Sequence, residues 1–152
     1  DRLLFQRSRG PRDRGAEVGV LVANGKQLSI EDLGRVTGTV ESQKMMAYAS
    51  DIEVADDVAY YIVDLVQASR GDANIAMGGS PRATINLLKA ARVLAASDGR
   101  KHVYPDDVRT VLPYIMSHRI VLNPDAILRG EDVSNVLDRV TNQVKPPVSV
   151  KK

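Results

Sequence analysis

The sequence contains no cysteine and no tryptophan, and aromatic residues make up only 4% of the chain. Without cysteine, a disulfide framework and catalysis by a thiolate are both excluded. The low aromatic content argues against a platform on which nucleic-acid bases would stack. No apolar run reaches the length of a membrane span, and the polar start lacks the apolar segment of a signal peptide. We therefore expect a cytoplasmic protein without a membrane span.

The composition that remains is that of an ordinary globular domain. Of the 152 residues, 43% are hydrophobic and 26% are charged, a balance that supports one buried core. The formal net charge of +2 is too small to indicate a nucleic-acid partner by itself. Because natural proteins rarely begin with aspartate, Asp1 indicates an excision point, and we expect the chain to be the C-terminal piece of a longer protein.

Helical periodicity dominates the sequence, and no strand of useful length is apparent. Helices are expected over 16–23, 41–50, 56–69, 81–97 and 131–144, with another that starts at Pro105 and is kinked or broken at Pro113. The segment 56–69 has almost no polar face, which predicts a place in the middle of a bundle. The segment 70–79 is expected to be a connecting loop. These patterns predict an all-α bundle of about five or six helices.

The composition also divides the chain into three expected parts. Residues 1–15 are rich in arginine and glycine, which predicts a flexible basic arm without a packing partner. Residues 16–145 are expected to form the helical domain. Residues 146–152 follow two prolines and are expected to be a flexible tail.

The most informative segment is Gly78–Ala83, which opens the helix expected over 81–97. Ser80 suits the N-cap position, where its hydroxyl can accept a hydrogen bond from an amide of the first turn, and Pro81 suits the first helical position. Arg82 follows at a helix end whose dipole prefers an anion to a cation. Its presence is explained if Arg82 and the free amides bind a negative group such as a phosphate. The structural alternative is a salt bridge between Arg82 and a nearby carboxylate.

Other chemistry is weakly represented. His102 and His118 are the only histidines, and nothing in the sequence pairs either one with a nucleophile, so both are expected to be structural. The acidic pairs Asp56-Asp57 and Asp106-Asp107 lie in the first turns of expected helices, where compensation of the helix dipole explains them without catalysis. We expect no metal site.

Gly25-Lys26 invites comparison with a phosphate-binding loop, but the comparison fails. The pattern needs glycine at position 20 and serine or threonine at position 27, and the chain has Val20 and Gln27 there. The chain therefore lacks the loop that would hold the phosphates of ATP and Mg²⁺.

Several motifs occur in order along the chain with suitable spacings between them. They are Tyr61–Val66 with Ser69-Arg70, Gly79–Ala83, Leu87–Arg92, Val103–Val108 and His118–Ile120. Together they resemble the C-terminal lid of MoxR-type AAA+ ATPases, and the similarity covers roughly residues 41–140. Motifs that occur together in this order are much more specific than any one of them.

The resemblance implies an all-helical lid attached to an α/β ATPase core, of which residues 1–15 would be the remaining end. The family's sensor-2 arginine maps onto Arg82, preceded by Ser80 and Pro81, and would reach the γ-phosphate of ATP bound with Mg²⁺ by the core. The segment Asp1-Arg2-Leu3 is similar to the family's Asp-Arg-Phe, which makes Arg2 a candidate arginine finger. The implied partners are the chain's own core, neighbouring subunits of a hexameric ring, and client proteins with metal-binding adhesion folds. The parent would be a chaperone-like remodelling ATPase, and this chain alone would not hydrolyse ATP.

Two other functions are compatible with the sequence. A DNA-binding module is suggested by the pI of about 9.0 and the arginine-rich start. The helix at Pro105 nevertheless begins with two aspartates, where a recognition helix needs basic or amide side chains. An interaction scaffold without a nucleotide role is the third interpretation, because proline followed by acidic residues is a general signal for the start of a helix.

Overall fold

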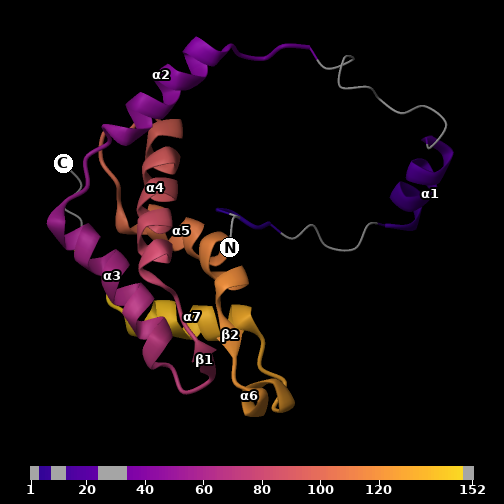
Figure 1. Cartoon of the computed structure of the whole chain (residues 1–152), viewed down its shortest axis with the longest axis vertical. Helices are drawn as coiled ribbons and strands as arrows, with labels where there is room; N and C mark the ends of the chain where they lie inside the picture. Colours follow the sequence, from indigo (N-terminus) through magenta and orange to yellow (C-terminus); the bar gives the residue numbers. More distant parts are fainter. Residues whose placement is uncertain (1–3, 8–12, 24–33, 149–152) are drawn as a thin grey trace. The chain divides into compact units, whose positions relative to one another are not determined.

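The structure is a computed structural model that describes residues 4–7, 13–23 and 34–148. These residues form seven α-helices, two short strands and a 3₁₀ turn (Figure 1). In chain order the elements are α1 (Arg14–Ala23), α2 (Thr39–Ser50), α3 (Asp56–Gly71), β1 (Ile75–Met77), α4 (Pro81–Ser97), α5 (Pro105–Met116), η2 (Ser117–Arg119), β2 (Val121–Leu122), α6 (Pro124–Leu128) and α7 (Val133–Gln143). The predicted helical bundle is confirmed. Within the described ranges, no helix has both the length and the apolar character needed to cross a bilayer.

The described residues fall into two compact units, and the boundary between them lies inside α2. The smaller unit contains α1 and the first residues of α2. Asp13 starts α1, because its Oδ1 accepts a hydrogen bond from the amide of Ala16 at 2.6 Å. The helix predicted over 16–23 is thereby confirmed, with a start two residues earlier. The segment Gly25-Lys26 lies outside the described residues.

The larger unit contains residues 4–6 and 46–148, and its core is organised around α4. The buried face of α4 repeats every four residues and consists of Ala83, Leu87, Ala91 and Ala95. Small side chains at three of these positions let α4 pack closely against α5 and α3 (Figure 1). Larger side chains on the two neighbours, such as Leu65 on α3 and Ile115 on α5, fill the space and are almost completely buried. This packing fixes the start of α4, where Arg82 lies.

Helix α3 contacts α4, α5, α7 and β1, in agreement with the predicted place in the middle of the bundle, but one of its faces is exposed to solvent. Tyr61, Ile62 and Leu65 face the core, whereas the side chain of Tyr60 remains 71% exposed. The helical period places Tyr60 and Val63 away from the buried face, and their apolar character alone did not reveal which side they occupy.

The region expected to be a loop over 70–79 contains strand β1, which is a correction to the sequence analysis. Strand β1 pairs antiparallel with β2, so that Ile75 lies opposite Leu122. Both side chains are buried in the core. Asn123 supports the pairing, because its backbone amide donates to the carbonyl of Asn74 at 2.8 Å and its side-chain amide donates to that of Ala73 at 2.8 Å.

Residues 4–6 contact α5, so the expectation that the N-terminal arm lacks a packing partner is wrong for this segment. The backbone amide of Gln6 donates to the carbonyl of Tyr114 at 2.9 Å. The ring of Phe5 stacks on the ring of Tyr114, with 4.7 Å between the centroids. Helix α5 itself continues through Pro113 to Met116, so the break considered at this proline is absent.

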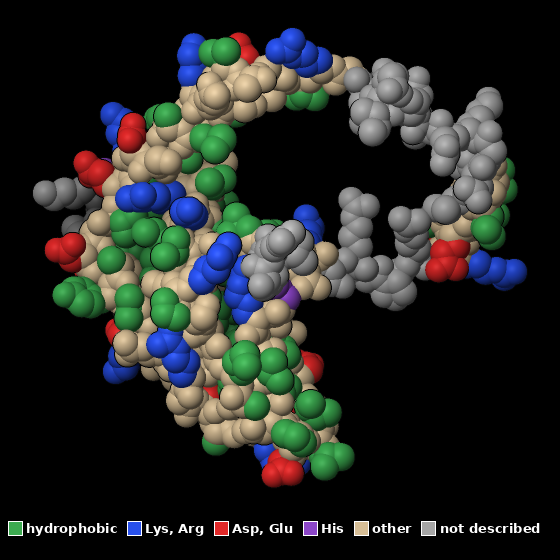
Figure 2. Space-filling model, in the orientation of Figure 1, with side chains coloured by type: hydrophobic (Ala, Val, Ile, Leu, Met, Phe, Trp, Pro, Cys, Tyr) green, Lys and Arg blue, Asp and Glu red, His purple; other side chains and the backbone are tan. Residues whose placement is uncertain are grey.

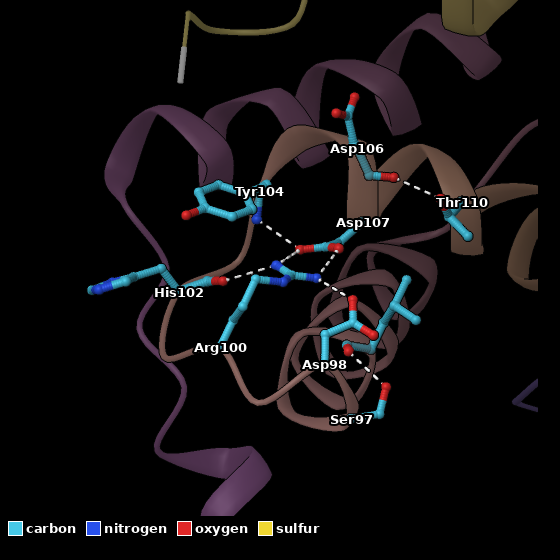
Figure 3. A network of polar contacts seen from close by, with 9 residues as sticks. Ser97, Asp98, Arg100, His102, Tyr104, Asp106, Asp107 and Thr110 are labelled. Carbon is cyan, nitrogen blue, oxygen red and sulfur yellow. Dashed lines mark hydrogen bonds and ion pairs between the residues drawn. The ribbon is translucent and has the colours of Figure 1, made fainter. Parts of the chain in front are cut away.

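An ion pair between the partly exposed Arg100, which follows α4, and the buried Asp107 in the first turn of α5 joins these two helices (Figure 3). Arg100 donates from Nη1 to Asp107 Oδ2 at 2.7 Å and from Nη2 to Asp107 Oδ1 at 2.6 Å. Asp107 Oδ2 also accepts the backbone amide of Tyr104 at 2.8 Å, and the Arg100 guanidinium lies over the Tyr104 ring. The hydrogen bonds to Asp107 and Asp98 raise the pKa of Arg100 above its ordinary value. Asp107 therefore joins α5 to the segment after α4 through Arg100, an ion pair that we call the clamp. This tertiary role goes beyond the compensation of the helix dipole that its position predicted.

A second ion pair joins the end of α3 to α7. Asp72 Oδ2 accepts a hydrogen bond from Arg139 Nε at 3.3 Å, and its side chain is only 5% exposed. Burial by itself would raise the pKa of Asp72, but hydrogen bonds from Asn74 and Arg139 outweigh it and lower the pKa below 3.8.

This lowered pKa gives a pH-dependent contribution to stability. A carboxyl group with a depressed folded-state pKa stabilises the fold above its unfolded pKa, and this contribution is lost as the pH falls through the folded value. We expect the free energy of unfolding of Asp72→Asn to fall less steeply than that of wild type between about pH 5 and pH 2. Denaturant unfolding of both chains across this range tests the prediction. Asp64→Asn, at an exposed position of α3, is the control and should follow wild type.

Candidate functional site at the start of helix α4

The predicted site residues lie where α4 begins. Pro81 is the first residue of the helix and Ser80 is the N-cap, as expected. The Ser80 hydroxyl makes no capping hydrogen bond, which corrects the sequence analysis. The amide of Ala83 is already satisfied by the backbone carbonyl of Ser80 at 2.8 Å, so this amide needs no side-chain acceptor. Among the described residues, the backbone amide of Arg82 has no acceptor.

The side chain of Arg82 is exposed to solvent. Within the described part of the chain, it forms neither an ion pair nor a hydrogen bond. The salt bridge considered as the structural alternative is therefore absent there. An exposed guanidinium next to an unsatisfied helical amide can bind a phosphate oxygen with both groups.

A second arginine increases the positive charge near this helix start. Burial, and to a smaller extent the charge of Arg82, lower the pKa of Arg119 below its ordinary value. Arg119 donates from Nη1 to the carbonyl of Ile115 and to that of Leu4, the latter at 3.3 Å. On the face drawn in Figure 2, Lys and Arg side chains gather around α5 beside a histidine.

In the turn that precedes Arg82, backbone atoms of α3 leave room only for glycine at position 78, and side chains surround Gly79 closely. A Cβ on Gly78 would lie 2.6 Å from the backbone carbonyl oxygen of Ser69, and a Cβ on Gly79 would lie 2.7 Å from Cε of Met116. Neither contact is sterically allowed without a shift of the backbone or of the Met116 side chain. The two glycines therefore let the start of α4 approach α3 and α5 closely.

Comparison with known proteins assigns this part of the fold to a family. Residues 67–140 match the family described as the AAA lid domain, from the end of α3 through most of α7. This region is an AAA lid domain. The resemblance to the lid of MoxR-type ATPases, predicted from the ordered motifs, is confirmed.

Relatives of the lid domain include both named and uncharacterised proteins. The uncharacterised protein YeaC of Bacillus subtilis is 31% identical over 148 residues, which are 97% of this chain and 46% of YeaC. Chaperone MoxR1 of Mycobacterium tuberculosis is 31% identical over 122 residues, which are 74% of this chain and 32% of MoxR1. The chain thus spans less than half the length of these relatives.

A solved structure shares the fold. It is the crystal structure of a candidate ATPase from Cytophaga hutchinsonii, with a TM-score of 0.80 and 21% sequence identity. The superposition covers 96% of this chain and 47% of that chain.

The remaining predicted site residues do not join Arg82. Arg2 lies outside the described residues. His102 Nδ1 lies 3.0 Å from Glu53 Oε2 at the surface. Both residues line an open cavity of about 620 Å³ that contains none of the predicted site residues. Across the described ranges, no three His, Asp or Glu residues are grouped so that they could hold a metal ion.

Sequence reasoning missed the contribution of Arg119 to the charge around Arg82. The available signal was the motif His118–Ile120, which was used only to recognise the lid domain. The residues that hold the Gly78-Gly79 turn were missed for the same reason, because Ser69-Arg70 entered the comparison only as a motif.

Proposed function

We infer that this chain is the lid of a MoxR-type AAA+ ATPase, in which Arg82 acts as the sensor-2 arginine and contacts the γ-phosphate of ATP. The ATP is held by an ATPase core outside this chain. The observation that carries the proposal is the state of Arg82, which is exposed, has no acidic partner among the described residues and starts a helix beside an unsatisfied amide. Such a group gains a strong charge-assisted hydrogen bond when a phosphate arrives.

The chemistry of the site fits a phosphate and does not fit a metal. Arg82 and Arg119 bring positive charge to the start of α4, and the described residues offer no acidic cluster for a cation. We therefore assign Mg²⁺ to the core together with the other phosphates of ATP. Because it lacks the phosphate-binding loop, the chain alone is expected to show no ATP hydrolysis.

The whole protein would use Arg82 to convert the nucleotide state into subunit motion. Contact between Arg82 and the γ-phosphate is possible with ATP and is lost with ADP, so the lid has different interactions in the two states. In a ring of subunits, here proposed as a hexamer, this difference would move the lid against its own or a neighbouring core. A chaperone-like activity on client proteins agrees with the name of the relative Chaperone MoxR1. Proteins with metal-binding adhesion folds are the clients that we propose.

Hydrogen exchange in the whole protein tests this proposal. With a non-hydrolysable ATP analogue, we expect slower exchange of the amides in residues 79–84 than with ADP, because the γ-phosphate orders the start of α4. A peptide from α7 should exchange equally in both states. In Arg82→Ala, the difference between the two nucleotides should disappear. Equal exchange of residues 79–84 with the ATP analogue and with ADP in the wild-type protein would contradict the proposal.

A further inference from the structure

Ser69 is a completely buried polar residue near the end of α3, and its hydroxyl serves two backbone groups. Its Oγ donates to the carbonyl of Val66 at 2.7 Å and accepts the amide of Gly79 at 3.0 Å. A buried amide without a partner is costly, and Gly79 lies between β1 and α4, where no ladder or helical hydrogen bond supplies an acceptor. The hydroxyl of Ser69 therefore fixes the amide of Gly79 at this point.

Arg70 holds the other polar group of the same glycine. Its Nε donates to the carbonyl of Gly79 at 2.5 Å. Consecutive residues of α3 thus bind both the amide and the carbonyl of Gly79. This pair of contacts specifies the position and the orientation of the turn together.

Steric contacts remove the remaining freedom of the turn. A Cβ on Gly78 would lie 2.6 Å from the carbonyl oxygen of Ser69, so no side chain fits there, and the side chains of Met116 and Val66 lie close to Gly79. The ring of Pro81 fixes the φ angle of the first residue of α4. Only Ser80 and Pro81 separate Gly79 from Arg82, so a displacement of Gly79 is transmitted to Arg82.

From these contacts we propose that Ser69 and Arg70 are positioning residues for Arg82. Their hydrogen bonds to Gly79, which we call the latch, hold the Gly78-Gly79 turn against α3 and orient Arg82 toward the γ-phosphate. This inference rests on the function proposed above. Misplacement of a catalytic group by about 1 Å can reduce a rate by about 10²-fold. Loss of the latch should therefore lower the rate of ATP hydrolysis by displacing Arg82, without weakening the binding of the rest of the nucleotide.

The test uses Ser69→Ala and Arg70→Ala in the whole protein. We expect each substitution to lower the turnover number for ATP hydrolysis about 10-fold to 100-fold. Affinity for the non-hydrolysable ATP analogue should fall, whereas affinity for ADP should stay unchanged, since ADP lacks the γ-phosphate. Arg70→Lys retains a donor and should recover part of the activity. In an Arg82→Ala background, either alanine substitution should have no further effect on turnover.

Ser97→Ala is a matched control. The hydroxyl of Ser97 also donates to a carbonyl three residues earlier, that of Leu94 at 2.7 Å, but it holds no turn. This variant should keep wild-type turnover. Because Arg70 is exposed, Arg70→Ala keeps the test decisive even where the buried Ser69→Ala impairs folding.

The possible results distinguish a failure of the positioning role from a failure of the proposed function. A loss of activity with Arg82→Ala but none with Arg70→Ala or folded Ser69→Ala overturns the positioning role alone. Equal losses of ATP and ADP affinity, or losses that add fully to that of Arg82→Ala, also overturn it. Unchanged turnover in Arg82→Ala overturns the proposed function, and the latch inference with it.

Discussion

Arg82→Ala in the whole protein is expected to lower the turnover number for ATP hydrolysis about 10²–10³-fold, as the loss of one preorganised donor to a developing charge does elsewhere. Arg82 is exposed and has no acidic partner within the described part of the chain, so its removal breaks no internal ion pair there. The free energy of unfolding should therefore stay close to that of wild type. Steady-state hydrolysis together with thermal unfolding of the same samples measures both quantities.

Two further variants show whether the effect comes from geometry or from charge alone. Arg82→Lys keeps the positive charge but loses the planar fork of donors, and we expect an intermediate loss of turnover. Lys101→Ala removes the same charge at another exposed position and should leave turnover unchanged. Wild-type hydrolysis by Arg82→Ala would instead favour the interaction scaffold, in which the lid has no nucleotide role.

The helices and the position of Arg82 could be predicted because their signals are local. Apolar residues at helical spacing define α4, Pro81 marks its start, and Gly99 adopts the positive φ of +71° that suits a residue just after a helix. The ordered motifs, one of which contains Arg82, predicted the lid domain from the sequence alone. Local sequence is sufficient where a residue's neighbours in the chain are also its partners in space.

The strands could not be predicted because their pairing is not local. Strands β1 and β2 have three and two residues, too few for the alternating pattern that identifies a strand. Their pairing joins Ile75 to Leu122, which are far apart in the sequence. The contacts of Phe5 with Tyr114 and of Asp72 with Arg139 were missed for the same reason.

Polar side chains were the least predictable part of the site. Ser80 has the sequence context of a capping residue and makes no capping bond, whereas Ser69 has no such context and holds the turn before α4. A hydroxyl can satisfy any donor that the fold brings near it, so its role depends on tertiary placement. The structure was therefore needed to move from Arg82 alone to the residues that position it.

Asp107→Ala is expected to destabilise the chain by about 3 kcal/mol, the lower end of the range for removing one partner from a buried ion pair. The carboxylate of Asp107 is 7% exposed and accepts two hydrogen bonds from Arg100. Its loss also leaves the amide of Tyr104 without its acceptor. The cost stays at the lower end because Asp98 still contacts Arg100 at 2.8 Å. Denaturant unfolding at neutral pH measures the change in free energy.

Asp106→Ala is the matched control, because Asp106 carries the same charge in the same first turn of α5. Its side chain is exposed (Figure 3), and compensation of the helix dipole is worth only about 0.3–1 kcal/mol. The sequence treats the two aspartates alike, so similar losses from both variants would mean that dipole compensation alone explains Asp107. A loss at least twice as large for Asp107→Ala, largely absent when Arg100 is already alanine, would establish the clamp as a tertiary interaction.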